Sequence, residues 1–229
     1  MLDNLFRRYD SIIVLDTETS GLDFKNDKII ELSAVRIINN NYQIVVTHEL
    51  DEFIKLPEGR SVPENIAKLT GITDDVLLHH GNSSAYVSNK FKELFCDERI
   101  LVIAYNAQFD MNFIYYFLAE NNLAYLLKKI NMLDAYTIYK DRHEYPHKLE
   151  NAIIKYNLED KVVNSHRAID DTLALIEVLK EMAKEEDDLH KYINLFGYNP
   201  KYGVSGLKIS SVTYKPQPYN VKTKLYEVI

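Results

Sequence analysis

The sequence predicts a mixed α/β fold, in which helices pack against one sheet and a short extension follows at the carboxyl end. Two observations carry this prediction. Residues 12–50 contain three apolar, alternating stretches joined by short turns, which is the pattern of an antiparallel meander. From residue 100 onward, short apolar runs alternate with segments of helical period, which indicates strands and helices that share a sheet.

Five stretches are expected to be strands. The first is an apolar run that begins at Ile12 and ends in a turn containing Gly21. Turn-forming residues at 39–41 separate the next two strands, and the last two are short apolar runs bounded by polar residues. The expected ranges of these four later strands are 28–38, 42–50, 100–104 and 131–133.

Six helices are expected around these strands. They cover residues 64–69, 84–95, a segment from just after 104 to about 121, 134–139, 149–156 and 168–184. Ser83 or Ser84 and Asp134 are side chains that favour a helix start. In the last helix, apolar residues from Leu173 to Ala183 recur at helical spacing, so one face of this helix is expected to be buried.

The composition changes near residue 187, which divides the chain into a main domain over 1–186 and an extension over 187–229. An acidic run at 185–188 ends the last helix, and residues 192–229 are rich in Tyr, Pro and Lys without a long helical period. Two alternatives remain open for the extension. It is either a strap across the domain or an interface with a second copy of the chain or another protein.

Length, charge and cysteine content narrow the class of protein. A chain of 229 residues with 46% hydrophobic residues has enough apolar side chains for the core of one domain. A net charge of −7 argues against a protein that binds nucleic acid non-specifically through a basic surface. It is compatible with an acidic pocket whose bound cations contact a phosphate. With one cysteine, no leader and no long apolar run, we expect a cytoplasmic protein with no membrane partner.

Two acids close the first strand. Because residues two apart on a strand point to the same side, Asp16 and Glu18 are expected to face one place. Two adjacent buried carboxylates repel each other, which costs several kcal/mol unless a cation compensates. Oxygen-only ligands suit Mg²⁺ or Mn²⁺. The ordinary alternative is an exposed strand end whose two acids lie in water.

Three further residues are candidates for the same site. Asp110 follows the strand at 100–104, and His166 and Asp171 lie where the last helix begins. Each has an ordinary alternative. Asp110 could be a first-turn acid favoured by the helix dipole, His166 a hydrogen-bonded loop histidine, and Asp171 a charge on a solvated face. It is their order along the chain, together with Asp16 and Glu18, that makes the set specific.

The set resembles the DEDDh branch of the DnaQ-like 3′-to-5′ exonucleases. Three motifs carry the resemblance: Asp-x-Glu at 16–18, Asn-Ala-x-Phe-Asp at 106–110 and His-x-x-x-x-Asp at 166–171. The resemblance covers residues 9–184 and includes the segment 69–73. Within the family, the chain resembles the proofreading epsilon subunit of bacterial DNA polymerase III. The resemblance implies an exonuclease domain over 1–186 with a ribonuclease H-like, mixed five-stranded sheet. Tyr105 departs from the family, in which a histidine often stands there, but the chemistry does not require an imidazole at that position.

The resemblance also implies a site. It assigns two divalent ions, Mg²⁺ or Mn²⁺, to four metal-binding and catalytic acids, which are Asp16, Glu18, Asp110 and Asp171. His166 matches the histidine that acts as general base. The substrate-binding candidates are Thr17, Thr19, Gly21, Leu22, Thr70, Asn106 and Phe113.

The function implied is removal of nucleoside 5′-monophosphates from the 3′ end of single-stranded DNA, as in proofreading or repair. The expected partners are therefore the 3′ end of a single strand and a DNA polymerase subunit, with a homodimer as a further alternative. Two other functions remain open. One is a 3′-to-5′ exonuclease of RNA or oligoribonucleotides, and the other is a module that docks on a polymerase through the tyrosine-rich extension.

Overall fold

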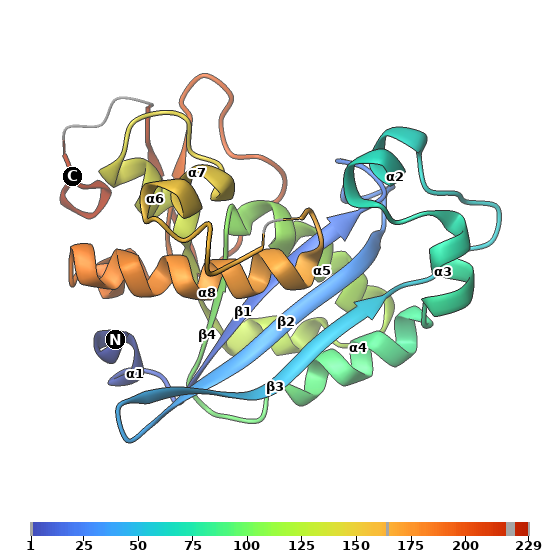
Figure 1. The fold of residues 1–229 in the computed structure, drawn as a ribbon, viewed down its shortest axis with the longest axis horizontal. Helices are drawn as coiled ribbons and strands as arrows, with labels where there is room; N and C mark the ends of the chain where they lie inside the picture. Colours follow the sequence, from blue (N-terminus) through green and yellow to red (C-terminus); the bar gives the residue numbers. More distant parts are fainter. Residues whose placement is uncertain (1, 164, 219–222, 229) are drawn as a thin grey trace.

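A five-stranded mixed sheet forms the centre of the computed structural model, which describes residues 2–163, 165–218 and 223–228 (Figure 1). The strands are β1 (Ser11–Thr19), β2 (Ile29–Asn40), β3 (Gln43–Phe53), β4 (Ile100–Ala104) and β5 (Asn131–Asp134). Their order across the sheet is β3-β2-β1-β4-β5. The first three strands pair antiparallel, and β4 and β5 continue parallel to β1. The predicted five-stranded mixed sheet with flanking helices is therefore confirmed.

The helices surround this sheet. They are α1 (Asp3–Phe6), α2 (Glu64–Thr70), α3 (Asp74–His80), α4 (Ser84–Glu93), α5 (Ala107–Glu120), α6 (Ala135–Arg142), α7 (Leu149–Lys155) and α8 (Ala168–Glu185), with 3₁₀ turns η1 (Ala124–Lys129), η2 (Leu189–Tyr192) and η3 (Leu225–Glu227). Ser83 and Asp134 accept backbone N–H groups and cap α4 and α6 as predicted. Helix α3, which the sequence did not predict, begins at the cap Thr73. None of the helices in the described ranges is long and apolar enough to cross a membrane.

Alternation along β1 divides the core between the two faces of the sheet. Ile12 and Val14 pack in the cluster that includes α8, whereas Ile13 and Leu15 pack in the cluster that includes α4 and α5. Figure 1 shows α8 lying across one face of the sheet. This arrangement decides which helix each later residue of β1 meets, because side chains continue to alternate along the strand.

The extension packs on the main domain. Strands β6 (Leu195–Tyr198) and β7 (Thr213–Pro216) pair with each other in parallel. Asn194 joins them to the central sheet, because its backbone N–H donates to the carbonyl of Met132 and its side-chain oxygen accepts the Met132 N–H, both at 2.8 Å. Tyr192 and Phe196 are fully buried. The described part of the extension is thus a strap on its own domain.

Removal of residues 187–229 is expected to destabilise the protein severely. The deletion removes the buried side chains of Tyr192, Phe196 and Leu225, and burial of each large apolar side chain is worth about 1.5–3 kcal/mol. We expect the free energy of unfolding, measured by urea denaturation, to fall by about 5 kcal/mol or more, or the truncated chain to remain unfolded. Tyr202→Ala, at a side chain that is 71% exposed, is the control that should change nothing. An unchanged urea midpoint after truncation would contradict the described packing.

Candidate metal centre

The acids of β1 lie on the face of the sheet that α8 covers. Asp16 and Glu18 continue the row of Ile12 and Val14, because every second residue of a strand points to the same side. Beyond Val14 strand β1 has no partner on the β4 side, since the pairing of β1 with β4 ends at Val14 and Ile103. The end of β1 therefore leaves room beside it for side chains from the helices.

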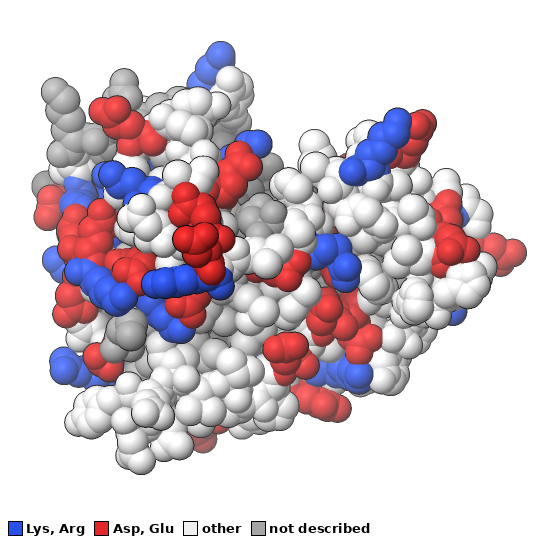
Figure 2. Space-filling model, in the orientation of Figure 1, with Lys and Arg blue, Asp and Glu red and all other residues white. Residues whose placement is uncertain are grey.

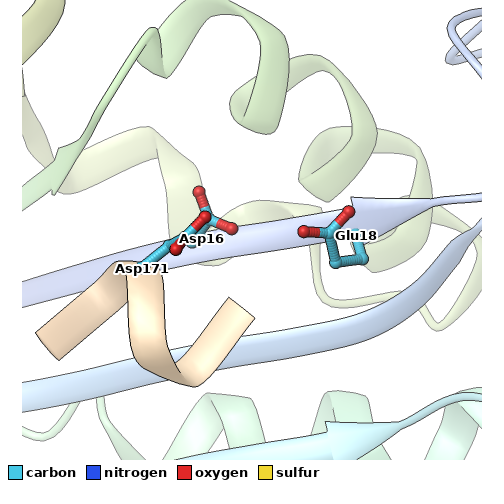
Figure 3. A group of neighbouring side chains, drawn as sticks. All are labelled: Asp16, Glu18 and Asp171. Atoms are coloured by element: carbon cyan, nitrogen blue, oxygen red, sulfur yellow. The ribbon is translucent and has the colours of Figure 1, made fainter. Parts of the chain in front are cut away.

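Helix α8 brings a third carboxylate to this place. Asp171 lies in the first turn of α8, and Asp16, Glu18 and Asp171 each offer a carboxylate oxygen within 4.8 Å of the others. Figure 3 shows Asp171 reaching from α8 to Asp16, with Glu18 farther along β1. Residues more than 150 positions apart in the sequence thus meet at one point.

Asp110 approaches from the other face of the sheet. Thr17 points toward α5, opposite to its neighbours on β1, and its hydroxyl donates a hydrogen bond of 2.8 Å to Oδ1 of Asp110. Asp110 is 3% exposed. Among the described residues it is not part of the group within 4.8 Å, but its charge acts on Asp16 and Glu18. It stands beside the three acids, with its carboxylate held by Thr17.

Burial opposes ionisation of all four acids, and the charges of neighbouring acids add to it. Loss of solvent raises the pKa of Asp16 well above its usual value, and the nearby charges of Asp110, Asp171 and Glu18 raise it further. Burial, followed by the charge of Asp171, raises the pKa of Glu18 to about 8. Burial raises the pKa values of Asp110 and Asp171 to about 7 each. At neutral pH this group cannot carry its full negative charge without a compensating cation.

The donor set fits hard divalent cations. All ligand atoms are carboxylate oxygens, which is the chemistry that Mg²⁺ and Mn²⁺ prefer. In addition, Oδ1 of Asp171 is buried without a hydrogen-bond partner in the described chain. A buried acceptor that lacks a partner is costly, and a bound cation would satisfy it.

His166 lies in the connection that leads into α8. It is exposed, and its backbone is left-handed with φ of 56°. This conformation costs on the order of 1–3 kcal/mol for a residue other than glycine and occurs at functional sites more than elsewhere. Its ring makes no hydrogen bond to the described part of the chain, so it is available to a bound molecule. It precedes Asp171 by five residues, at the end of α8 that faces the acids.

The substrate-binding candidates divide into two groups. Leu22, which is 82% exposed, and Asn106 face solvent. They follow β1 and β4, whose carboxyl ends meet at the same edge of the sheet because the two strands are parallel. A Cβ on Gly21 would lie 2.3 Å from Oδ2 of Asp27, so a larger residue at this position would have to displace the Asp27 side chain.

The other candidates are buried. The hydroxyl of Thr17 is bonded to Asp110, that of Thr19 donates to the carbonyl of Gly21 at 2.6 Å, and that of Thr70 donates to the carbonyl of Ile66 at 3.0 Å. Phe113, a residue of α5, packs in the core, with 5.0 Å between its ring centroid and that of Phe109. The hydroxyls of the three threonines are therefore already engaged within the chain.

Two residues support the site in a way that the sequence analysis did not predict. Asp134 is buried, and its Oδ1 accepts the backbone N–H groups of Asn106 and Ala107 at 2.9 and 3.1 Å, which fixes the start of α5 and hence Asp110. Glu31 is a buried charge within the otherwise apolar start of β2. A lone acid in an apolar strand was the available signal for Glu31.

A notch marks the surface above the end of β1. Figure 2 shows it between the part of the molecule that carries α6 and α7 and the part that carries α2, with Asp and Glu side chains visible at its base. A chain of net charge −7 thus presents acids at the floor of an open depression. Cations attracted there would in turn attract a phosphate.

Comparison with protein families decides the class. The family model RNase_T, described as an exonuclease, matches residues 13–179, which is most of the chain. The chain belongs to this exonuclease family. The resemblance to DnaQ-like exonucleases is therefore confirmed, and the protein is an exonuclease.

The relatives and structural neighbours of this exonuclease agree. DNA polymerase III of the PolC type from Clostridium perfringens is 33% identical over 84% of the chain, and that from Bacillus subtilis is 32% identical over 81%. The chain spans 12% of the length of each of these relatives. Exonuclease I of E. coli in complex with a dA16 oligonucleotide shares the fold, with a TM-score of 0.69 and 19% identity over 80% of this chain and 42% of that one.

The raised pKa values predict how the stability of this exonuclease depends on pH. An acid whose pKa is higher in the folded than in the unfolded protein stabilises the fold at pH below its unfolded value, near 4, and this stability is lost as pH rises through the folded value. For Glu18, Asp110 and Asp171 the loss extends to pH of about 7–8. In a chelator, the melting temperature should therefore fall between pH 5 and pH 8, by about 2–4 °C for each kcal/mol lost.

Added Mn²⁺ should reverse this loss, and its stabilising effect should grow over the same pH range because cations bind the ionised acids. Thermal unfolding with and without Mn²⁺ measures both effects. Asp171→Asn removes one titrating group and should flatten the dependence in chelator. A melting temperature that rises steadily from pH 5 to pH 8 in chelator would show that these acids do not repel one another in the folded protein.

Proposed function

We propose that this exonuclease removes nucleotides one at a time from the 3′ end of single-stranded DNA, by metal-dependent hydrolysis that releases nucleoside 5′-monophosphates. The observation that carries the proposal is the meeting of Asp16, Glu18 and Asp171 within 4.8 Å, with Asp110 beside them. Phosphodiester hydrolysis needs charge neutralisation at the phosphate, and a cluster of carboxylates that requires cations supplies the place for it.

Divalent ions bound there would lower the pKa of water and neutralise charge on the phosphate and the leaving oxygen. Asp16, Glu18 and Asp171 would hold them, and Asp110, kept in place by Thr17, would complete the set. Mg²⁺ and Mn²⁺ fit the all-oxygen donors equally well.

In this proposal His166 is the general base. It accepts a proton from the attacking water as the water oxygen bonds to phosphorus and the bond between phosphorus and the 3′ oxygen breaks. That oxygen remains on the shortened strand and takes a proton from solvent. The exposed ring without a hydrogen-bond partner in the described chain leaves a nitrogen free for this proton. An imidazole suits the role because a ring nitrogen can accept a proton from water and release it again.

The terminal nucleotide would lie at the edge of the sheet where β1 and β4 end. The exposed Leu22 offers an apolar surface for its base, and the backbone from Thr19 to Gly21 lies under its sugar. Asn106 would meet the next nucleotide, and Thr70 and Phe113 would shape the pocket from below. The net charge of −7, with acidic and basic side chains interspersed over the face in Figure 2, suits a short single-stranded end held at a metal site rather than a duplex held by a basic surface.

The preference for DNA rests on relatives. The curated relatives are DNA polymerases, and exonuclease I of E. coli was solved with a DNA oligonucleotide. For the same reason we propose that the chain works in the cytoplasm beside a DNA polymerase and corrects its 3′ ends. Co-purification with a polymerase from cell extract tests this partnership, and a chain that is recovered without one contradicts it.

The experiment that tests the proposed reaction uses DNA and RNA oligonucleotides of the same sequence, labelled at the 5′ end, with Mg²⁺ or Mn²⁺. We expect a ladder that shortens from the 3′ end of DNA, nucleoside 5′-monophosphates as products, and no reaction in a chelator. Faster degradation of RNA would reassign the substrate. Intact DNA and RNA after long incubation would contradict the proposal and favour a polymerase-associated binding module.

A further inference from the structure

Glu31 is a buried carboxylate next to the acids of β1. It is 0% exposed, and it is the direct partner of Glu18 in the antiparallel pairing of β1 with β2. Directly opposite residues of neighbouring strands share a face of the sheet. Glu31 therefore lies on the same face as Asp16 and Glu18, and its charge contributes to the raised pKa of each.

Both oxygens of Glu31 are already engaged. Oε1 accepts hydrogen bonds from Nη2 and Nε of Arg167, at 2.6 and 2.8 Å, and Oε2 accepts the backbone N–H of Ala168 at 3.0 Å. Removing a charge from water is costly unless it is paired and hydrogen-bonded, and these contacts meet both conditions. Glu31 is thus distinct from the carboxylates that need a cation.

These contacts fix where α8 begins. Ala168 is the first residue of α8, and the side chain of Arg167 at the N-cap position does not cap the helix. Glu31 supplies the missing acceptor from β2, and a carboxylate at a helix N-terminus is also favoured by the helix dipole. The guanidinium of Arg167 lies 4.7 Å from the ring centre of Phe53 on β3, which holds it from a second strand.

We infer that Glu31 is a positioning residue, which with Arg167 fixes the start of α8 on β2 and so holds His166 and Asp171 at the acids of β1. The inference rests on the proposed function. His166 immediately precedes Arg167, and Asp171 lies three residues after Ala168, within the first helical turn. A shift of this turn would move the base and one metal-binding acid together, whereas Asp16 and Glu18 would stay on the sheet.

Glu31→Gln tests the inference, because glutamine keeps the shape but offers one acceptor oxygen and no charge. We expect Mn²⁺ binding, measured by electron paramagnetic resonance of the free ion, to weaken by about 10- to 100-fold, and kcat on a DNA oligonucleotide to fall in the same range. The KM should change little, because Leu22 and the Gly21 turn do not depend on α8. Arg167→Lys, which keeps the charge but loses the planar fork, should show a smaller loss of both.

The matched control is Asp97→Asn. Asp97 pairs with Arg36, a buried arginine on the same strand β2 but away from the acids. Its substitution should lower the melting temperature and leave Mn²⁺ affinity and kcat unchanged. Measurements are made well below the melting temperature of each variant, so that unfolding does not imitate loss of function.

Two outcomes would overturn the inference. One is that Glu31→Gln and Asp97→Asn lose equal stability while both keep the Mn²⁺ affinity and kcat of the wild type. The second outcome applies if Glu31→Gln does not fold. In that case, an Arg167→Lys protein with unchanged Mn²⁺ affinity would overturn the inference. The Mn²⁺ measurement needs no catalysis, so weaker binding by Glu31→Gln in a protein that degrades no nucleic acid would refute the proposed reaction while it supports the positioning role.

Discussion

Asp16→Asn should abolish exonuclease activity while it stabilises the metal-free protein. Burial and the charges of Asp110, Asp171 and Glu18 all oppose ionisation of Asp16, so its loss removes both a central ligand and a buried carboxylate that is costly to ionise. Loss of a residue that only supports a metal ligand lowers activity by up to about 100-fold. Asp16 is proposed as a ligand itself, so the rate of DNA degradation should fall by more than this. At pH 8 in a chelator, the melting temperature should rise by a few degrees. Oligonucleotide digestion and thermal unfolding measure the two effects.

Asp188→Asn is the control with the opposite pattern. Asp188 is also buried, but it pairs with Arg142 and accepts a hydrogen bond from the hydroxyl of Tyr226 at 2.9 Å. Breaking a buried pair costs about 3–5 kcal/mol, so this variant should lose stability and keep its activity when folded. If Asp16→Asn instead destabilised the metal-free protein as Asp188→Asn does, Asp16 would be a structural acid.

His166→Ala should lower kcat by a factor on the order of 10² to 10⁴, which is the usual contribution of a general base. Because His166 is exposed and makes no hydrogen bond within the described chain, the substitution should leave Mn²⁺ binding unchanged. Added imidazole should restore part of the rate by taking the proton in place of the missing ring.

The control for this variant is His79→Ala, at an exposed histidine in the last turn of α3. It should keep the wild-type rate with or without imidazole. A His166→Ala protein that turns over at the wild-type rate would remove His166 from the proposed mechanism, and one that also loses Mn²⁺ would indicate that the loop, rather than the base, was damaged.

Much of the sheet and part of the site could be predicted from sequence, because both follow from local patterns. Alternation along β1 placed Asp16 and Glu18 on one side of the strand, and the structure shows them on the face that α8 covers. The caps Ser83 and Asp134 were recognisable because a helix start needs a side-chain acceptor nearby in sequence. Helix α3 escaped because its apolar residues are confined to positions 76–78 and do not recur at helical spacing.

The remaining features depend on contacts between distant segments. The bond from Thr17 to Asp110 arises because α5 packs on the opposite face of β1 from α8, which no local pattern reveals. Glu31 meets Ala168 across 137 positions of sequence. The packing of the extension also depends on distant contacts. Tyr192 and Phe196 are buried against the main domain, and the sequence of the extension alone does not show which surface covers them.

The central claim is that acids from β1, α5 and α8 form one seat for divalent cations. Crystals grown or soaked with Mn²⁺, measured at a wavelength where manganese scatters anomalously, test it most directly. We expect two anomalous peaks beside Asp16, within ligand distance of the carboxylates of Glu18, Asp110 and Asp171. Crystals that hold Mn²⁺ at saturating concentration and show no peak beside Asp16 would contradict the claim.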